Sequence, residues 1–290
     1  MPGVSTPASR RPALRRCALA LTVLHGLELV PGDDGVEVEG TPPVLVPWDE
    51  IDAVVGPIDP ESPHARRRLG SWFAMRRAVV ERYDLDDRAR PVALPRGHVL
   101  HPGADWVRHR VPGGVVDLGL GFVGLLDDPD EVVVVPTGVL TASRIDPTPW
   151  WPKQLRYLDR MGAMAAARFV ADRGAPLRPI GDCDVVTLLA SPVFRASICG
   201  ADAAALRSAA VPMRRRGWLD LTRVDPAFAM AAAAATDPVE RGFDRVVLIS
   251  PHEVALALDG GRVTHWSLHD PPPRSGSAAG LRGHGGGSRR

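Results

Sequence analysis

The stretch Val254–Leu268, which reads VALALDGGRVTHWSL, contains the clearest β-hairpin signal in the chain. Apolar-rich runs lie on both sides of Asp259-Gly260-Gly261, and such turn residues adopt the backbone conformations that a tight hairpin connection requires. A second turn, Gly32-Asp33-Asp34-Gly35, precedes the alternating segment Val36–Glu39, and Val44–Val46 follows as a further short strand. The sequence therefore predicts antiparallel hairpins near both ends of the chain.

Helices are expected between these hairpins, without a regular alternation of strand and helix. Ser62-Pro63 is typical of an N-cap followed by a first-turn proline, and apolar residues recur at helical spacing from there to about Tyr83. A second amphipathic helix is predicted from Lys153 to a stop at Gly174. The predicted fold class is α+β, with mainly antiparallel sheet hairpins packed with separate helices and two halves that can share one core.

Shorter patterns predict the remaining elements. Strands are expected at Ala18–Val30, Val115–Leu118, Glu131–Val135, Val139–Ser143, Asp184–Ala190 and Arg245–Ser250. Helices are expected in the alanine-rich segments 201–210 and 225–235.

Composition divides the chain into five regions. Residues 1–16 are expected to form a flexible basic N-terminal arm, and residues 270–290 a disordered tail rich in glycine, serine and arginine. An N-terminal α+β half covers residues 17–146, and a C-terminal α+β half covers residues 153–269. Residues 147–152 form a junction of prolines and tryptophans, where regular structure is expected to stop.

The composition disfavours several functional classes. The 290 residues include 35 basic and 34 acidic ones, so the chain lacks the positive surplus typical of nucleic-acid-binding proteins. Lys153 is the single lysine, a bias typical of a high-GC bacterium, and it does not follow a glycine-rich phosphate loop. Three cysteines without a pairing motif favour reduced thiols in the cytoplasm. No stretch approaches the about 20 apolar residues of a membrane helix.

The string Gly119–Gly124, GLGFVG, matches the dinucleotide-binding fingerprint in its letters. That fingerprint requires a helix directly after the glycines, but Asp127-Asp128-Pro129 and a new strand follow at once. We therefore expect these glycines to allow a bend or close packing, and no dinucleotide cofactor is predicted.

The densest group of chemically active side chains lies in the segment Gly97–His109. Four of them are candidate ligands: His98, His101, Asp105 and His109. Imidazole and carboxylate groups bind zinc and similar divalent ions, and they also serve in acid–base catalysis. One hypothesis is therefore a metal-dependent or acid–base, hydrolase-like enzyme that uses this segment.

A second set of residues is a candidate surface for a partner. The set comprises Trp150, Trp151, Arg214, Arg215, Arg216 and Trp218. Tryptophans anchor many interfaces, although the rings of Trp150 and Trp151 could instead seal the junction between the two halves. The arginine runs also leave nucleic-acid binding through phosphate contacts as an alternative.

These motifs contain no coherent catalytic constellation. The leading prediction is a soluble cytoplasmic protein that binds another protein or a small-molecule ligand without catalysis. The hydrolase-like enzyme with a divalent metal and the nucleic-acid-binding protein stay as alternatives, and no membrane partner is expected.

Overall fold

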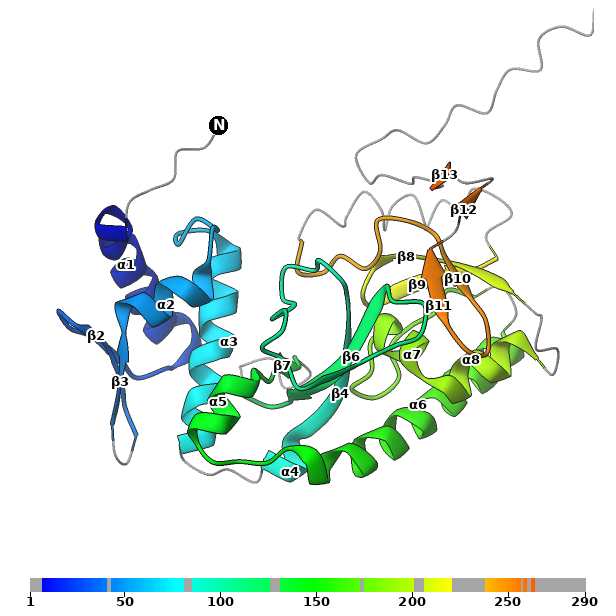
Figure 1. Cartoon of the computed structure of the whole chain (residues 1–290), viewed down its shortest axis with the longest axis horizontal. Helices are drawn as coiled ribbons and strands as arrows, with labels where there is room; N and C mark the ends of the chain where they lie inside the picture. The colour runs from blue at the N-terminus through cyan, green and yellow to red at the C-terminus, as the bar shows by residue number, and fades with distance from the viewer. Residues whose placement is uncertain are drawn as a thin grey trace, which may run out of the picture.

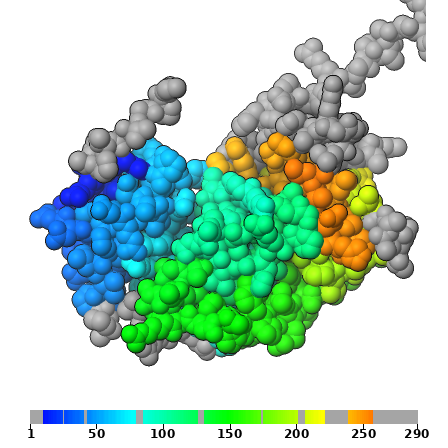
Figure 2. Space-filling view, in the orientation of Figure 1, coloured from blue at the N-terminus to red at the C-terminus, as the bar shows by residue number. Residues whose placement is uncertain are grey.

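The computed structural model has an α+β fold in which antiparallel sheets alternate irregularly with helices (Figure 1). It describes residues 7–40, 43–80, 85–125, 131–172, 175–200, 206–220, 238–256, 258–259 and 262–263. Figure 2 shows the N-terminal segments, in blue, at one end of the molecule, and the segment around residues 238–256, in orange, toward the other. None of the helices among these residues combines the length and apolarity needed to cross a membrane.

The N-terminal part combines helices with a small sheet. Its elements are α1 (Pro7–His25), β1 (Leu29–Pro31), β2 (Gly35–Val38), β3 (Val44–Pro47), α2 (Trp48–Val55) and α3 (Pro63–Val80). The three strands form an antiparallel sheet in chain order, which confirms the hairpin expected around Gly32-Asp33-Asp34-Gly35. The N-cap of α3 is also confirmed, because the Ser62 hydroxyl accepts a hydrogen bond from the Ala65 amide at 3.2 Å.

Helix α1 replaces both the flexible arm and the first strand expected from the sequence. Four buried side chains recur along it at the spacing of one helix face: Leu14, Cys17, Ala18 and Leu21. This face packs against α3 and β1. The prediction of a loose arm through Arg16 is therefore wrong from Pro7 onward, and the strand expected at Ala18–Val30 is limited to β1, because burial of this stripe stabilises a helix.

The central sheet connects the two ends of the molecule. Its elements are α4 (Leu85–Arg88), β4 (Ala89–Pro95), β5 (Arg108–Arg110), β6 (Val116–Phe122) and β7 (Val133–Val134). Strand β6 pairs with β4 on one side and with both β5 and β7 on the other, always antiparallel. The segment expected as the strand Val139–Ser143 is instead the short helix α5 (Thr137–Ala142), with Val139 and Leu140 buried on one side.

The glycines of the GLGFVG string lie within β6, so no helix follows them. A Cβ atom added to Gly119 would overlap the indole ring of Trp106, and one added to Gly121 would meet Val132 and the backbone of Val133. The expectation of close packing is thus confirmed, because only glycine lets these side chains approach the strand.

The outer edge of β4 has no free amide donor between Pro91 and Pro95. Both prolines lack an N–H, and the Ala93 amide between them donates a hydrogen bond to the hydroxyl of Thr187 at 2.9 Å. These three residues alternate along the strand and face away from β6. Thr187 is itself buried, so helix α7 closes this edge.

The C-terminal part packs helices against a second four-stranded sheet. Its elements are the 3₁₀ turn η1 (Thr148–Trp150), α6 (Trp151–Ala171), α7 (Val185–Ala190), α8 (Pro192–Cys199), β8 (Arg207–Met213), β9 (Arg216–Leu219), β10 (Val247–Ile249), β11 (Val254–Leu256), β12 (Leu258–Asp259) and β13 (Arg262–Val263). The sheet order is β11-β10-β8-β9. Of the hairpin expected around Asp259-Gly260-Gly261, the pairing beside the turn is confirmed, since Asp259 pairs with Arg262 and Leu258 with Val263. Its first expected arm, at Val254–Leu256, pairs instead with β10, and residues 264–268 lie outside the described residues.

Two predicted elements of this part have the opposite type. The expected strand Asp184–Ala190 is helix α7, because the Asp184 carboxylate caps the helix by accepting the Thr187 amide at 2.8 Å. The alanine-rich segment 201–210 was expected to be helical, but its described end belongs to strand β8. The expected helix at 225–235 and the tail 270–290 lie outside the described residues.

Two large clusters of buried side chains form the core. One contains the N-terminal helices, the first sheet and the C-terminal end of β6 with Leu120 and Phe122, and it includes Trp150. The other contains α6, α7, α8 and the second sheet, together with Ala93 of β4 and the N-terminal end of β6 with Val116 and Leu118. Trp151 packs against both clusters, so the junction lies between them, as one interpretation of the Trp150-Trp151 pair proposed.

Candidate functional site

The four predicted metal ligands have different neighbours. The Nε2 atom of His101 lies 3.0 Å from the carboxylate of Asp117. The Asp105 carboxylate accepts the amide of Gly138 at 2.7 Å, and the His109 ring packs edge-to-face on Trp151 at 4.4 Å between centroids.

His98, the fourth candidate, is largely buried beside residues 239–241. The described residues, which include all four candidates, contain no group of three or more histidine, cysteine, aspartate or glutamate side chains arranged to hold a metal. The structure therefore does not bring the predicted ligands together.

The candidate partner residues are also mostly engaged inside the fold. Trp150 and Trp218 are buried, and the Arg216 guanidinium lies over the Trp218 ring. Arg214 pairs with the Asp184 carboxylate. Arg215, which lies between Arg214 and Arg216 in the sequence, is exposed. These residues do not form a continuous outer surface, because Trp150 and Trp218 are buried.

A buried carboxylate organises the loop that follows β4. Asp117, on β6, is only 1% exposed and accepts a hydrogen bond from Arg108 on β5 at 2.7 Å. His101 contacts the same oxygen, and Arg96 lies 3.7 Å from the other one. The Nδ1 atom of His101 accepts the amide of Gly103, so Nε2 carries the proton that is donated to Asp117. This arrangement fixes the loop that carries His98.

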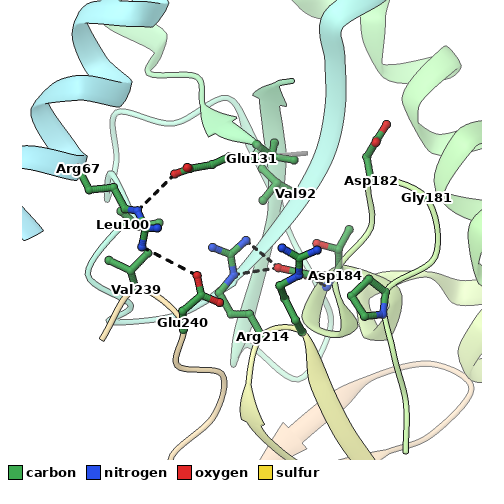
Figure 3. Close-up of a pocket in the computed structure, with 14 residues that line it drawn as sticks. Arg67, Val92, Leu100, Glu131, Gly181, Asp182, Asp184, Arg214, Val239 and Glu240 are labelled. Atoms are coloured by element: carbon green, nitrogen blue, oxygen red, sulfur yellow. Dashed lines mark hydrogen bonds and ion pairs between the residues drawn. The ribbon is translucent and has the colours of Figure 1, made fainter. Parts of the chain in front are cut away.

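A first pocket lies where α3, the central sheet and the second sheet meet, and it is lined mainly by charged side chains (Figure 3). We call it the ionic pocket. Arg214 points at Asp184, and its Nε and Nη2 atoms lie 2.8 and 2.6 Å from one carboxylate oxygen. Across the pocket, Arg67 of α3 lies between Glu131 and Glu240 at 3.6 and 3.9 Å.

These pairs make the ionic pocket a junction between parts of the chain that are distant in sequence. Its cavity volume is about 90 Å³, which corresponds to about three water molecules. Because Arg67, Arg214 and their acidic partners satisfy one another, a ligand would have to displace an existing ion pair. We therefore assign the ionic pocket a structural role.

A second, larger pocket includes His98 in its lining. It is lined by residues 95–99, 114–115 and 241–245 together with Pro238 and Leu256, and its volume is about 580 Å³. We call it the arginine pocket, because Arg96, Arg241 and Arg245 line it against a single carboxylate, that of Asp244. Its size falls within the range of about 300–1,000 Å³ that is typical of small-molecule sites.

The Arg245 side chain carries a hydrogen-bond donor whose acceptor is not among the described residues. Its Nε is buried and has no hydrogen-bond partner among the described residues, and the Asp244 carboxylate lies 3.8 Å away. Buried donors are nearly always paired, because an unpaired one costs about 1–3 kcal/mol. Phe243, Val99 and Val115 add apolar surface beside these groups.

His98 lines the arginine pocket, senses the charges of Arg214 and Asp184 from the ionic pocket, and is neutral in the fold. Burial lowers the pKa of its imidazole to about 4, and the positive charge of Arg214 acts in the same direction. The backbone of Val239, the carboxylate of Asp184 and the backbone of Arg241 oppose this shift without cancelling it. The arginine pocket thus receives its positive charge from guanidinium groups alone at neutral pH.

This depressed pKa predicts a loss of stability in acid. From pH 6.5 down to about 4, the unfolded chain protonates His98 while the folded chain does not. The free energy of unfolding should therefore fall by about 3 kcal/mol over that window, with the full contribution present above it. Urea unfolding of the wild type and of His98→Gln at several pH values measures this. The variant should have a shallower acid slope, and equal slopes would contradict the prediction.

Sequence reasoning did not single out Arg96, Arg241 or Arg245. Arg96 follows β4, whereas Arg241 and Arg245 lie on the segment 238–245, and their sequence neighbours form no motif. The loop around His98 was found for another reason, as a metal-ligand pattern. Comparison with known proteins adds no assignment, since no family model matches the chain and no match was found among curated proteins or solved structures.

Proposed function

We propose that this protein binds a small anionic molecule in the arginine pocket. The observation that carries the proposal is the gathering of three guanidinium groups, those of Arg96, Arg241 and Arg245, around a cavity of about 580 Å³. Guanidinium groups bind carboxylate and phosphate oxygens through paired, charge-assisted hydrogen bonds.

The apolar part of the lining supports a ligand with an organic body. Val99, Val115 and Phe243 line the same cavity as the arginines, and sites for small molecules typically combine apolar walls with a few oriented polar groups. The position of the loop 95–99 is set by Asp117, so one wall of the pocket is formed before any ligand binds. We place this binding activity in the cytoplasm, because the three cysteines are free and buried, as in reducing compartments.

Calorimetric titration of the full chain tests the proposal with three probes that share one ring: phenyl phosphate, benzoate and benzamide. We expect saturable binding of at least one anion. Benzamide should bind at least about tenfold more weakly, because it carries no negative charge and forms no ion pair with arginine. Arg245→Gln and Arg241→Gln should each weaken binding by at least about fivefold.

The matched control is Arg110→Gln, the same substitution at an exposed arginine of β5 outside the pocket. It should leave the affinity unchanged. Binding of benzamide as tight as that of the anions, or binding that survives Arg245→Gln and Arg241→Gln, would contradict the proposal.

A further inference from the structure

A third pocket lies between helix α6 and the loop 175–180, away from the arginine pocket. Its volume is about 260 Å³, less than half of the 580 Å³ of the arginine pocket. The buried side chains of Ala165, Leu177 and Leu188 line it, and Phe169 and Ile180 add further apolar surface. We call it the α6 pocket.

Two arginines stand at the α6 pocket without partners. Arg168, on α6, and Arg178, in the loop, both line it, and among the described residues neither guanidinium has a hydrogen bond or an ion pair. Most arginines elsewhere in the lined pockets have an acidic partner, as Arg214 does with Asp184. The Asp172 carboxylate also lines the pocket. Two positive charges and one negative charge leave a net charge of about +1, which matches a monoanion.

The walls of the α6 pocket are held in place without a ligand. The backbone of Leu177 exchanges two hydrogen bonds with Gly217, at 2.6 and 3.2 Å, and the backbone of Ile180 pairs with Cys183 at 3.0 and 3.1 Å. On the α6 side, the Arg207 guanidinium lies over the Phe169 ring, 5.2 Å from its centroid. A preformed pocket binds more tightly because little ordering entropy is lost when the ligand enters.

We infer that the α6 pocket is a second binding site, which takes a monocarboxylate with a short apolar body. The carboxylate lies between Arg168 and Arg178, and the apolar part lies on Ala165, Leu177 and Leu188. The guanidinium pair provides orientation through charge-assisted hydrogen bonds, and the apolar walls provide the burial that a free carboxylate such as acetate cannot use. This site is independent of the arginine pocket and shares no lining residue with it.

Calorimetric titration of the full chain with hexanoate tests the assignment. Hexanamide keeps the apolar chain without the charge, and acetate keeps the charge without the chain. We expect hexanoate to bind at one site at least about tenfold more tightly than either, because each lacks one half of the interaction. Arg168→Gln and Arg178→Gln should each weaken hexanoate binding by at least about fivefold.

Two control variants separate this site from the rest of the molecule. Arg156→Gln changes an exposed arginine of the same helix outside the pocket, and Arg245→Gln changes the arginine pocket. Both should leave the affinity of the hexanoate site that Arg168→Gln weakens unchanged. Hexanoate binding that persists in the Arg168→Gln/Arg178→Gln double variant, or that is lost in Arg245→Gln, would overturn the assignment. So would the absence of saturable hexanoate binding, or hexanamide binding of equal strength.

Discussion

Asp117→Ala should lower the free energy of unfolding by about 3–5 kcal/mol, the largest effect that we expect from a single substitution. The substitution removes a carboxylate that is only 1% exposed and leaves Arg108, Arg96 and His101 without their shared acceptor. Arg108 and His101 are themselves mostly buried, so water replaces the lost contacts poorly. Urea unfolding at pH 7.5 measures the change.

The matched control is Asp244→Ala, because the Asp244 side chain is 75% exposed and lies 3.8 Å from its nearest guanidinium. Surface ion pairs contribute about 0–1 kcal/mol, so this variant should be close to wild type. If Asp117→Ala is no more destabilising than Asp244→Ala, the buried carboxylate does not organise the loop as described. Where Asp117→Ala still folds, anion binding in the arginine pocket should weaken too, since Asp117 positions one of its walls.

Gly119→Ala should destabilise the protein by about 3 kcal/mol, because a Cβ atom at this position would overlap the indole ring of Trp106. The ring cannot move away easily. It is 4% exposed, and its Nε1 donates a hydrogen bond to the Leu120 carbonyl at 3.0 Å. Thermal and urea unfolding of the variant measure the loss.

Gly32→Ala serves as the control, since the nearest atom to an added Cβ there is a carbonyl oxygen at 3.7 Å. This variant should change stability by less than about 1 kcal/mol. A double-mutant cycle with Trp106→Leu gives a second test. The two substitutions should be less destabilising together than the sum of their separate effects, because the smaller side chain leaves room for the alanine methyl group. Strict additivity would show that the two residues do not meet.

Local sequence signals predicted the turns of the hairpins and the helices α3 and α6 well, although they missed the long helix α1. The turn at Asp259-Gly260-Gly261, the N-cap at Ser62 and the amphipathic pattern of α6 each carry their information within a few residues. Residues 184–190 show the limit of such reasoning. Their β-branched and apolar run is typical of a buried strand, but the Asp184 cap and burial among helices stabilise a helix.

The candidate site was much less accessible from the sequence. The dense group at residues 98–109 drew attention as metal ligands, yet the structure turns His101 toward Asp117 and His109 toward Trp151. Contacts with Asp117 on β6 and with Trp151 on α6 determine these orientations, and no local sequence pattern indicates such long-range contacts. The arginine pocket likewise combines three distant segments, and its residues become neighbours only when β4, β6 and the segment 238–245 come together.

The closed edge of β4 has a consequence for how copies of this protein behave toward one another. An exposed strand edge acts as a template on which another chain can add a strand, and this is a common route to aggregation. With prolines at 91 and 95 and the Ala93 amide bound to Thr187, an incoming strand would find no donor along this stretch. In concentrated solutions of the folded protein, strands of other copies should therefore not add to the β4 edge of the central sheet.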